Sequence, residues 1–255
     1  VNKEFDVTIV SRRKLFGEWL DRSIHEIQGN WKDDSFAKKV VEAGYDVIVD
    51  TQIFTEEQAA RAVSIGNGHC KHFIYISTDS VYAHPADNID EDEPIDLLQL
   101  KWKYGYNKRK AELYLINHAS EFDFAWSAIR PTITFGDTRI PVGFSTKRNT
   151  YTIAKRILQR KPILYFDEPN TRHGICHVSI FGAAAVELFL NEKAYGQCFH
   201  ISDDYAYTYA EIFAAIEKVL GAKGTYVKCD TEMLKKYSKS SYEEMIYDKN
   251  PTFTL

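Results

Sequence analysis

The residues best suited to chemistry lie within residues 73–112. Tyr104 and Lys108 are four positions apart in a predicted helix, so they share one face and an ammonium can lie close to a phenol. A nearby cation favours the phenolate and lowers the tyrosine pKa, as a general base requires. Thr78 and Asp79 follow the apolar run 73–76, which is typical of a buried parallel strand. These four side chains predict a site that moves a proton to or from a hydroxyl group.

Short apolar runs alternate with amphipathic stretches along the chain, and this pattern predicts an α/β fold with a parallel sheet. Strand-like runs occupy residues 6–13, 24–28, 45–50, 73–76, 124–131 and 197–201. Helices are predicted at 35–43 with Ser35 as the cap, at 56–65 with Thr55 as the cap, and at 208–220 with Gly221 just past the end. The carboxyl ends of parallel strands form the crevice of such a sheet, which is where Thr78 and Asp79 fall.

Two segments resemble a known family. Residues 104–112, YGYNKRKAE, resemble the Y-G-x-x-K-x-x-A-E segment of the extended short-chain dehydrogenase/reductases. Residues 75–82, YISTDSVY, resemble the strand-end motif that supplies the family's catalytic Ser or Thr. The chain is identified as a member of the NAD-dependent epimerase/dehydratase group, of the nucleotide-sugar type. The resemblance implies a Rossmann-type doubly wound parallel sheet with a small C-terminal substrate lobe.

The resemblance also implies a division of the chain. Residues 1–138 would form the dinucleotide-binding Rossmann domain, and residues 139–255 mostly the substrate lobe, with 173–201 returning to the Rossmann sheet. The first strand, the Gly-rich turn and the first helix of such a domain are absent from the sequence. The segments that close the fold in relatives are absent too, so we expect a chain truncated at both ends.

NAD or NADP is the cofactor that the resemblance implies. The strand at 6–13 ends in Arg12 and Arg13 without a carboxylate, which favours the 2′-phosphate of NADP, although the same pair is equally well explained as the start of a solvated loop. The remaining positions that the resemblance assigns to cofactor binding are Asp50, Thr51, Ser77, Tyr104, Lys108, Pro131 and Ile133.

The resemblance implies hydride transfer on a nucleotide sugar, with Tyr104, Lys108, Thr78 and Asp79 as the catalytic candidates. Ser80 and Arg172 would contact the substrate, although Arg172 is one position away from the commonest family spacing. Nucleotide-sugar 4,6-dehydratases carry Glu where this chain has Ser80, and a serine cannot accept a proton as a carboxylate can. This favours a 4-epimerase, an isomerase that works by transient oxidation, over a dehydratase. A reductase remains the alternative.

Two other classes of function remain open. Residues 29–59 resemble the chloroplast stem-loop RNA-binding proteins, which share this fold; the formal net charge of −4 argues against nucleic-acid binding. A regulatory member that binds a dinucleotide without turnover is the other alternative. Such a site has no need of Tyr104, Lys108 and Thr78 together, so this alternative is disfavoured.

The composition, with 44% hydrophobic and 27% charged residues, is that of an ordinary globular protein. The sequence shows no membrane-spanning run and no leader, and its four cysteines are scattered, so we expect a cytoplasmic protein without a metal site. Family members often dimerise through the helix that carries the Tyr and Lys. A homodimer would place Trp102, Tyr106, Leu113 and Tyr114 at its interface, unless these residues belong to the core.

Overall fold

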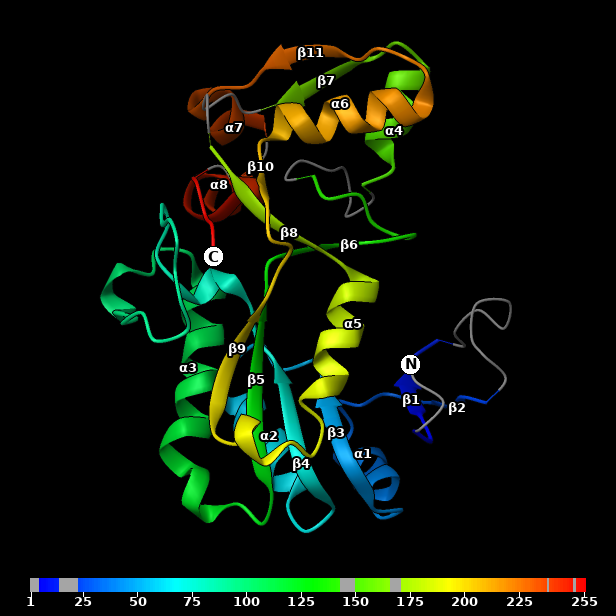
Figure 1. Ribbon diagram of the computed structural model, residues 1–255, viewed down its shortest axis with the longest axis vertical. Helices are drawn as coiled ribbons and strands as arrows, with labels where there is room; N and C mark the ends of the chain where they lie inside the picture. The colour runs from blue at the N-terminus through cyan, green and yellow to red at the C-terminus, as the bar shows by residue number, and fades with distance from the viewer. Residues whose placement is uncertain (1–4, 14–22, 143–149, 166–170, 238, 250) are drawn as a thin grey trace.

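A computed structural model describes residues 5–13, 23–142, 150–165, 171–237, 239–249 and 251–255. Its main sheet contains four parallel strands in the order β3-β4-β5-β9. These are β3 (Tyr45–Asp50), β4 (Cys70–Ile76), β5 (Ala125–Pro131) and β9 (Gln197–Ile201). Figure 1 shows their carboxyl ends pointing toward a smaller lobe. Four of the six strands predicted from the apolar runs therefore form this parallel sheet, with boundaries within a few residues of those expected.

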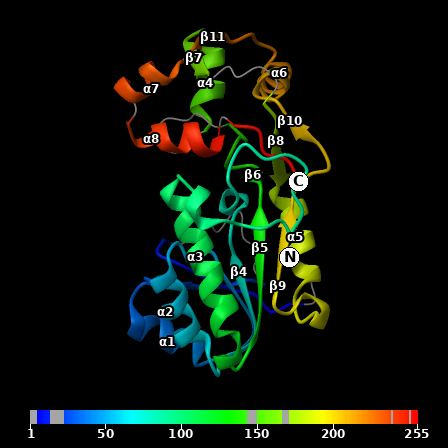
Figure 2. The ribbon, with the colours of Figure 1, turned by 90° about the vertical axis from the view of Figure 1, so that its left-hand side faces the viewer.

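Helices cover both faces of this sheet, as Figure 2 shows. On one face, α2 (Glu56–Gly66) and α3 (Lys103–His118) enclose a core that includes Phe73, Tyr75 and Leu115. On the other face, α5 (Val178–Glu187) packs over Ile74 and Ile129. This arrangement is that of a Rossmann-type α/β fold.

The N-terminal strands form a separate pair. β1 (Thr8–Ser11) and β2 (His25–Gln28) are parallel to each other and are followed by α1 (Asp34–Val41). In the part of the chain that the structure describes, β1 pairs with β2 alone and β3 with β4 alone. The predicted cap of α1 is wrong by two residues, because the Asp33 carboxylate, not Ser35, accepts the hydrogen bond from the Phe36 N–H (2.9 Å).

The lobe is built from two small sheets and two helices. β7 (Pro162–Tyr165) pairs with β11 (Thr225–Lys228), while β6 (Ile133–Phe135), β8 (His173–His177) and β10 (Ala206–Tyr207) form a three-stranded sheet. α4 (Thr152–Leu158) packs on α6 (Tyr209–Leu220) around a shared apolar cluster. A capping box of Thr208 and Glu211 begins α6, and Gly221 ends it in the left-handed conformation (φ 60°).

The last part of the chain returns from the lobe toward the sheet. It forms α7 (Thr231–Tyr237), α8 (Lys239–Glu244) and the π-helical turn η5 (Met245–Lys249), and it ends beside the loop that follows β4. Among the described residues, no helix is long and apolar enough to cross a membrane.

Candidate active site

Gly105 sets how closely α3 approaches the end of β4. A Cβ atom at this position would lie 2.0 Å from the carbonyl oxygen of Ser80, which is far closer than two such atoms can come. Because Gly105 lacks a Cβ, the first turn of α3 lies directly against the 3₁₀ turn η1 (Asp79–Val81). This contact brings the Tyr104 phenol near Thr78, whose hydroxyl acts to lower the pKa of Tyr104.

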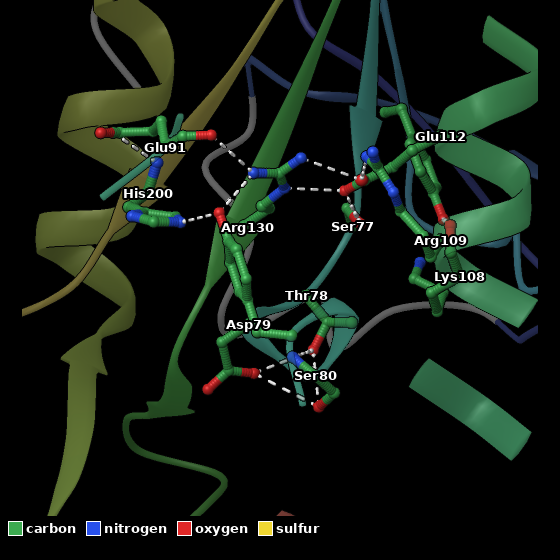
Figure 3. Close-up of polar contacts among 12 residues, drawn as sticks. Ser77, Thr78, Asp79, Ser80, Glu91, Lys108, Arg109, Glu112, Arg130 and His200 are labelled. Carbon is green, nitrogen blue, oxygen red and sulfur yellow. Dashed lines mark hydrogen bonds and ion pairs between the residues drawn. The ribbon is translucent and has the colours of Figure 1, made fainter. Parts of the chain in front are cut away.

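A compact hydrogen-bond network surrounds Thr78 (Figure 3). Its hydroxyl donates to Asp79 Oδ1 (3.0 Å), lies 3.1 Å from Ser80 Oγ and accepts from the Ser80 N–H (3.2 Å). All three residues are buried. Burial raises the pKa of Asp79, although Lys249 and the hydrogen bond from Thr78 act in the opposite direction. A carboxyl group with a raised pKa is typical of a site that exchanges protons.

Backbone carbonyl groups hold the Lys108 ammonium. The ammonium donates to the carbonyl oxygens of Ile53 (2.8 Å) and Ile76 (2.6 Å), and so joins the segments that follow β3 and β4. Burial lowers the pKa of Lys108 to about 7, against the opposing effects of Glu112 and Asp50. Burial also raises the pKa of Tyr104, and the nearby cation that most opposes this rise is Lys249. The four-residue spacing placed both residues in α3 correctly, but two backbone acceptors hold the ammonium.

A second polar cluster lies beneath the site and was not expected from the sequence. Glu112 is fully buried and accepts hydrogen bonds from Ser77 Oγ (2.6 Å), from Arg109 (2.7 Å) and from two nitrogens of Arg130 (2.9 and 3.0 Å). Arg130 also donates to the Tyr82 hydroxyl (2.6 Å). We call Ser77, Arg109, Glu112 and Arg130 the glutamate cluster. Its only signal among the quoted family motifs is Glu112, the last residue of the Y-G-x-x-K-x-x-A-E segment.

The other predicted cofactor residues lie at or near the carboxyl edge of the strands. Asp50 ends β3, is buried, and accepts from Trp31 Nε1 (3.2 Å) and from the Gln52 N–H (2.6 Å). Burial raises its pKa. Thr51 follows it and is exposed, and Pro131 ends β5.

The remaining predictions fall farther from Tyr104. Arg12 and Arg13 are exposed just past β1, and the side chain of Ile133 packs in the apolar cluster of the lobe. Arg172 donates to the Tyr205 hydroxyl (3.0 Å) and to the Ala206 carbonyl (2.8 Å), beside Glu211. The structure therefore groups Ser77, Thr78, Asp79, Ser80 and Tyr104, and it holds Arg172 against the strand β10.

A cleft of about 370 Å³ opens beside this group. The residues that line it come from three segments, namely the turn and loop after β4, the segment before α3, and the C-terminal turn: Ser80, Tyr82, Ala83, His84, Leu98, Gln99, Leu100, Lys101, Trp102, Tyr247 and Asp248. Tyr247 and Asp248 in the cleft, and Lys249 acting on Asp79, were not expected from the sequence, because these residues reach the site only through the return of the chain from the lobe.

A parallel sheet with helices on both faces, and a Tyr–Thr pair at its carboxyl edge, defines an enzyme of the short-chain dehydrogenase/reductase class. The family model for the NAD dependent epimerase/dehydratase family matches residues 57–197, which is more than half of the chain. The chain belongs to this family, whose members are NAD-dependent enzymes.

Solved structures share the fold. An epimerase from Methanothermobacter thermautotrophicus superposes with a TM-score of 0.70 at 14% identity, over 98% of this chain and 81% of that one. UDP-glucuronic acid 4-epimerase from Bacillus cereus, in complex with UDP-glucuronic acid and NAD, gives 0.64 at 16% identity, over 92% and 79%. dTDP-glucose 4,6-dehydratase from Bacillus anthracis, in complex with NAD, gives 0.65 at 15% identity, over 85% and 74%. No curated protein matches the sequence significantly.

Proposed function

We propose that this chain is a nucleotide-sugar 4-epimerase that uses NAD or NADP. The observation that carries the proposal is the close approach of the first turn of α3, which holds Tyr104, to the Thr78–Ser80 segment beside a cleft that Ser80 lines, where Ser80 stands in place of a second carboxylate. Solved structures with a similar fold include a UDP-glucuronic acid 4-epimerase with UDP-glucuronic acid and NAD and a UDP-glucose 4-epimerase with UDP-glucose, which supports this substrate class.

Each residue then has a definite task. Tyr104 takes the proton of a sugar hydroxyl, and Thr78 donates a hydrogen bond to the oxygen on which charge changes. Ser80 contacts the sugar from the wall of the cleft. The Arg172 guanidinium would bind a phosphate of the substrate after releasing its present partners near β10. The bound cofactor accepts and returns hydride.

The groups at the carboxyl edge fit a dinucleotide. The Lys108 ammonium and the Asp50 carboxylate can meet ribose hydroxyls, and exposed Arg12 and Arg13 can meet phosphate. Thr51, Ser77, Pro131 and Ile133 would contribute mainly through their backbone, since the side chains of Ser77 and Ile133 are buried in other contacts.

We also propose the division of the chain at residue 138, a cytoplasmic location and a homodimer that pairs α3 with its copy. Four free cysteines support a reducing compartment. Tyr106 and Ile116 are the large apolar side chains exposed on α3 and would lie at such an interface.

The test is Tyr104→Phe, assayed with UDP-glucose or UDP-glucuronic acid and NAD, with the C4 epimer followed by NMR. We expect turnover to fall about 10²- to 10⁴-fold, because the variant lacks the proton acceptor. Tyr106→Phe, on an exposed position of the same helix, is the matched control and should keep full activity. Unchanged turnover in Tyr104→Phe would refute the proposal, and accumulation of NADH in place of epimer formation would identify a dehydrogenase or a reductase that runs in its oxidative direction.

A further inference from the structure

The end of the chain is fixed between the sheet domain and the lobe. Phe253 donates its N–H to the Arg172 carbonyl (2.9 Å) and accepts from the Gly174 N–H (3.1 Å), which attaches it to β8. On the other side, the Ala86 N–H donates to the Thr252 carbonyl (2.9 Å). Residues 251–255 therefore connect the loop after β4 with the start of β8, and η5 precedes them directly.

This anchoring carries a charged pair into the active site. Lys249 Nζ lies 2.6 Å from Asp248 Oδ2, and the two side chains are 14% and 2% exposed. Tyr209 donates its hydroxyl to the Lys249 carbonyl (2.8 Å), and His84 Nδ1 lies 3.1 Å from the Asp248 carbonyl. Side chains from α6 and from the loop after β4 thus contact the backbone carbonyls of the pair. These contacts hold the pair in place in addition to the attraction between its two charges.

The Lys249 ammonium faces the groups that the proposed reaction uses. It lies 6.0 Å from the centre of the Trp102 ring, and that ring packs at 4.8 Å on the ring of Tyr104. The titratable groups that interact electrostatically with the ammonium are Asp79 from η1, Tyr104 from α3, His173 from β8, Tyr209 from α6 and Asp248 beside it, and His84 from the loop acts on Asp79 and His173. In contrast, two backbone carbonyls hold the Lys108 ammonium.

We propose that Lys249, oriented by Asp248, is a positioning residue of this active site, and that its charge favours the anionic forms of Tyr104 and Asp79 during proton transfer. This role rests on the proposed function, and it is the one that the sequence assigned to Lys108. The residue reaches the site only because residues 251–255 bind between the loop and β8.

The ionisation of the cluster agrees with this role. Burial opposes the charge of Lys249, but Asp248 and then Asp79 outweigh it and raise the pKa of Lys249, so the ammonium is charged at neutral pH. Burial raises the pKa of both Tyr104 and Asp79, and Lys249 is the strongest influence that lowers each of them.

The experiment measures Tyr104 directly and needs no substrate. Phenolate absorbance at 295 nm is titrated in the 255-residue protein and in its Tyr104→Phe variant, and the difference isolates Tyr104. The same subtraction is made in Lys249→Met, Lys249→Arg and Asp248→Asn, with circular dichroism to define the pH range in which each fold persists. Lys71→Met, at an exposed lysine, is the matched control.

We expect the midpoint pH of the Tyr104 titration to rise by about one unit or more in Lys249→Met. A buried unit charge near a phenol shifts the pKa of that phenol by at least this amount. Lys249→Arg should restore it. Asp248→Asn should shift the midpoint downward, because it removes a carboxylate and leaves the ammonium. If Lys249 and Asp248 had only a structural role, Lys249→Met and Asp248→Asn would shift the Tyr104 midpoint in the same direction.

An unchanged midpoint in folded Lys249→Met would overturn the proposal. If that variant does not fold, a midpoint in Asp248→Asn that is unchanged or higher would overturn it instead. Because the readout is independent of turnover, a failure here is distinct from a failure to find epimerase activity.

Discussion

Two buried polar clusters begin at consecutive residues after β4, and they differ in how their charges are balanced (Figure 3). Ser77 enters the glutamate cluster, where Glu112 is bound by two guanidinium groups. Thr78 enters the cluster of Asp79 and Tyr104, where hydroxyl groups are the closest partners and Lys249 is shared with Asp248.

The difference appears in the direction of the two carboxyl pKa values. Burial acts to raise the pKa of Glu112, but Arg130, Ser77 and Arg109 outweigh it and lower the pKa overall. For Asp79 burial prevails and raises the pKa. A fully paired carboxylate fixes the position of α3 against β5, whereas an incompletely compensated one keeps the capacity to exchange a proton.

The largest expected effect is on the paired cluster. Glu112→Gln should lower the free energy of unfolding by about 3–5 kcal/mol, because it leaves two buried guanidinium groups without their counter-charge. Urea denaturation monitored by circular dichroism measures this loss. Glu56→Gln removes the partner of Lys110 in a more exposed pair that joins α2 to α3 and should cause a much smaller loss. Equal losses in the two variants would show that the glutamate cluster is not a stabilising element.

A smaller loss is expected where α3 meets η1. Gly105→Ala should cost about 1–3 kcal/mol, because the new methyl group must push the helix away from the Ser80 carbonyl. It should also reduce turnover, since Tyr104 would separate from Thr78. Gly182→Ala in α5, where a Cβ meets nothing within 4 Å, should be neutral or stabilising by up to about 1 kcal/mol. If thermal melting and the activity assay show the two alanine variants to be equal, the close approach does not position the site.

The smallest effect, and the one of opposite sign, is expected at Asp79. Asp79→Asn should change stability at pH 7 by no more than about 1 kcal/mol and in the stabilising direction, since it removes a buried carboxylate that lacks full compensation. Because the pKa of Asp79 is raised in the folded protein, this carboxyl group stabilises the fold at pH values below its unfolded pKa of 3.8. The stabilisation is lost as pH rises through the folded pKa. Wild type should therefore lose stability relative to Asp79→Asn as pH rises above about 4.

Glu112 should show the reverse slope. Its lowered pKa contributes stability above the unfolded value of 4.5, and this contribution is lost as pH falls through the folded value. Denaturation midpoints of wild type, Asp79→Asn and Glu112→Gln between pH 3 and 8 measure both slopes. Parallel slopes for the two carboxyl groups would remove the distinction drawn between the clusters.

Local sequence patterns predicted most of the elements. The span 45–50 was predicted as observed, and Thr55 caps α2 and Gly221 ends α6 as expected. The cap of α1 was misplaced, because Asp33 and Ser35 both suit an N-cap and the sequence does not show which one adopts the extended backbone.

The sequence by itself determined which residues follow β4 and which residues α3 presents, since strand and helix periodicity are local properties. It did not determine where the Lys108 ammonium goes, which cation faces Tyr104, or that Glu112 meets Arg130. These depend on contacts across 18 positions for Glu112 and Arg130, 32 and 55 for Lys108, and 145 (249 − 104) for Lys249 and Tyr104, which only the packed fold brings together. Side-chain charges are assigned by burial and by neighbours in space, and both belong to the tertiary structure.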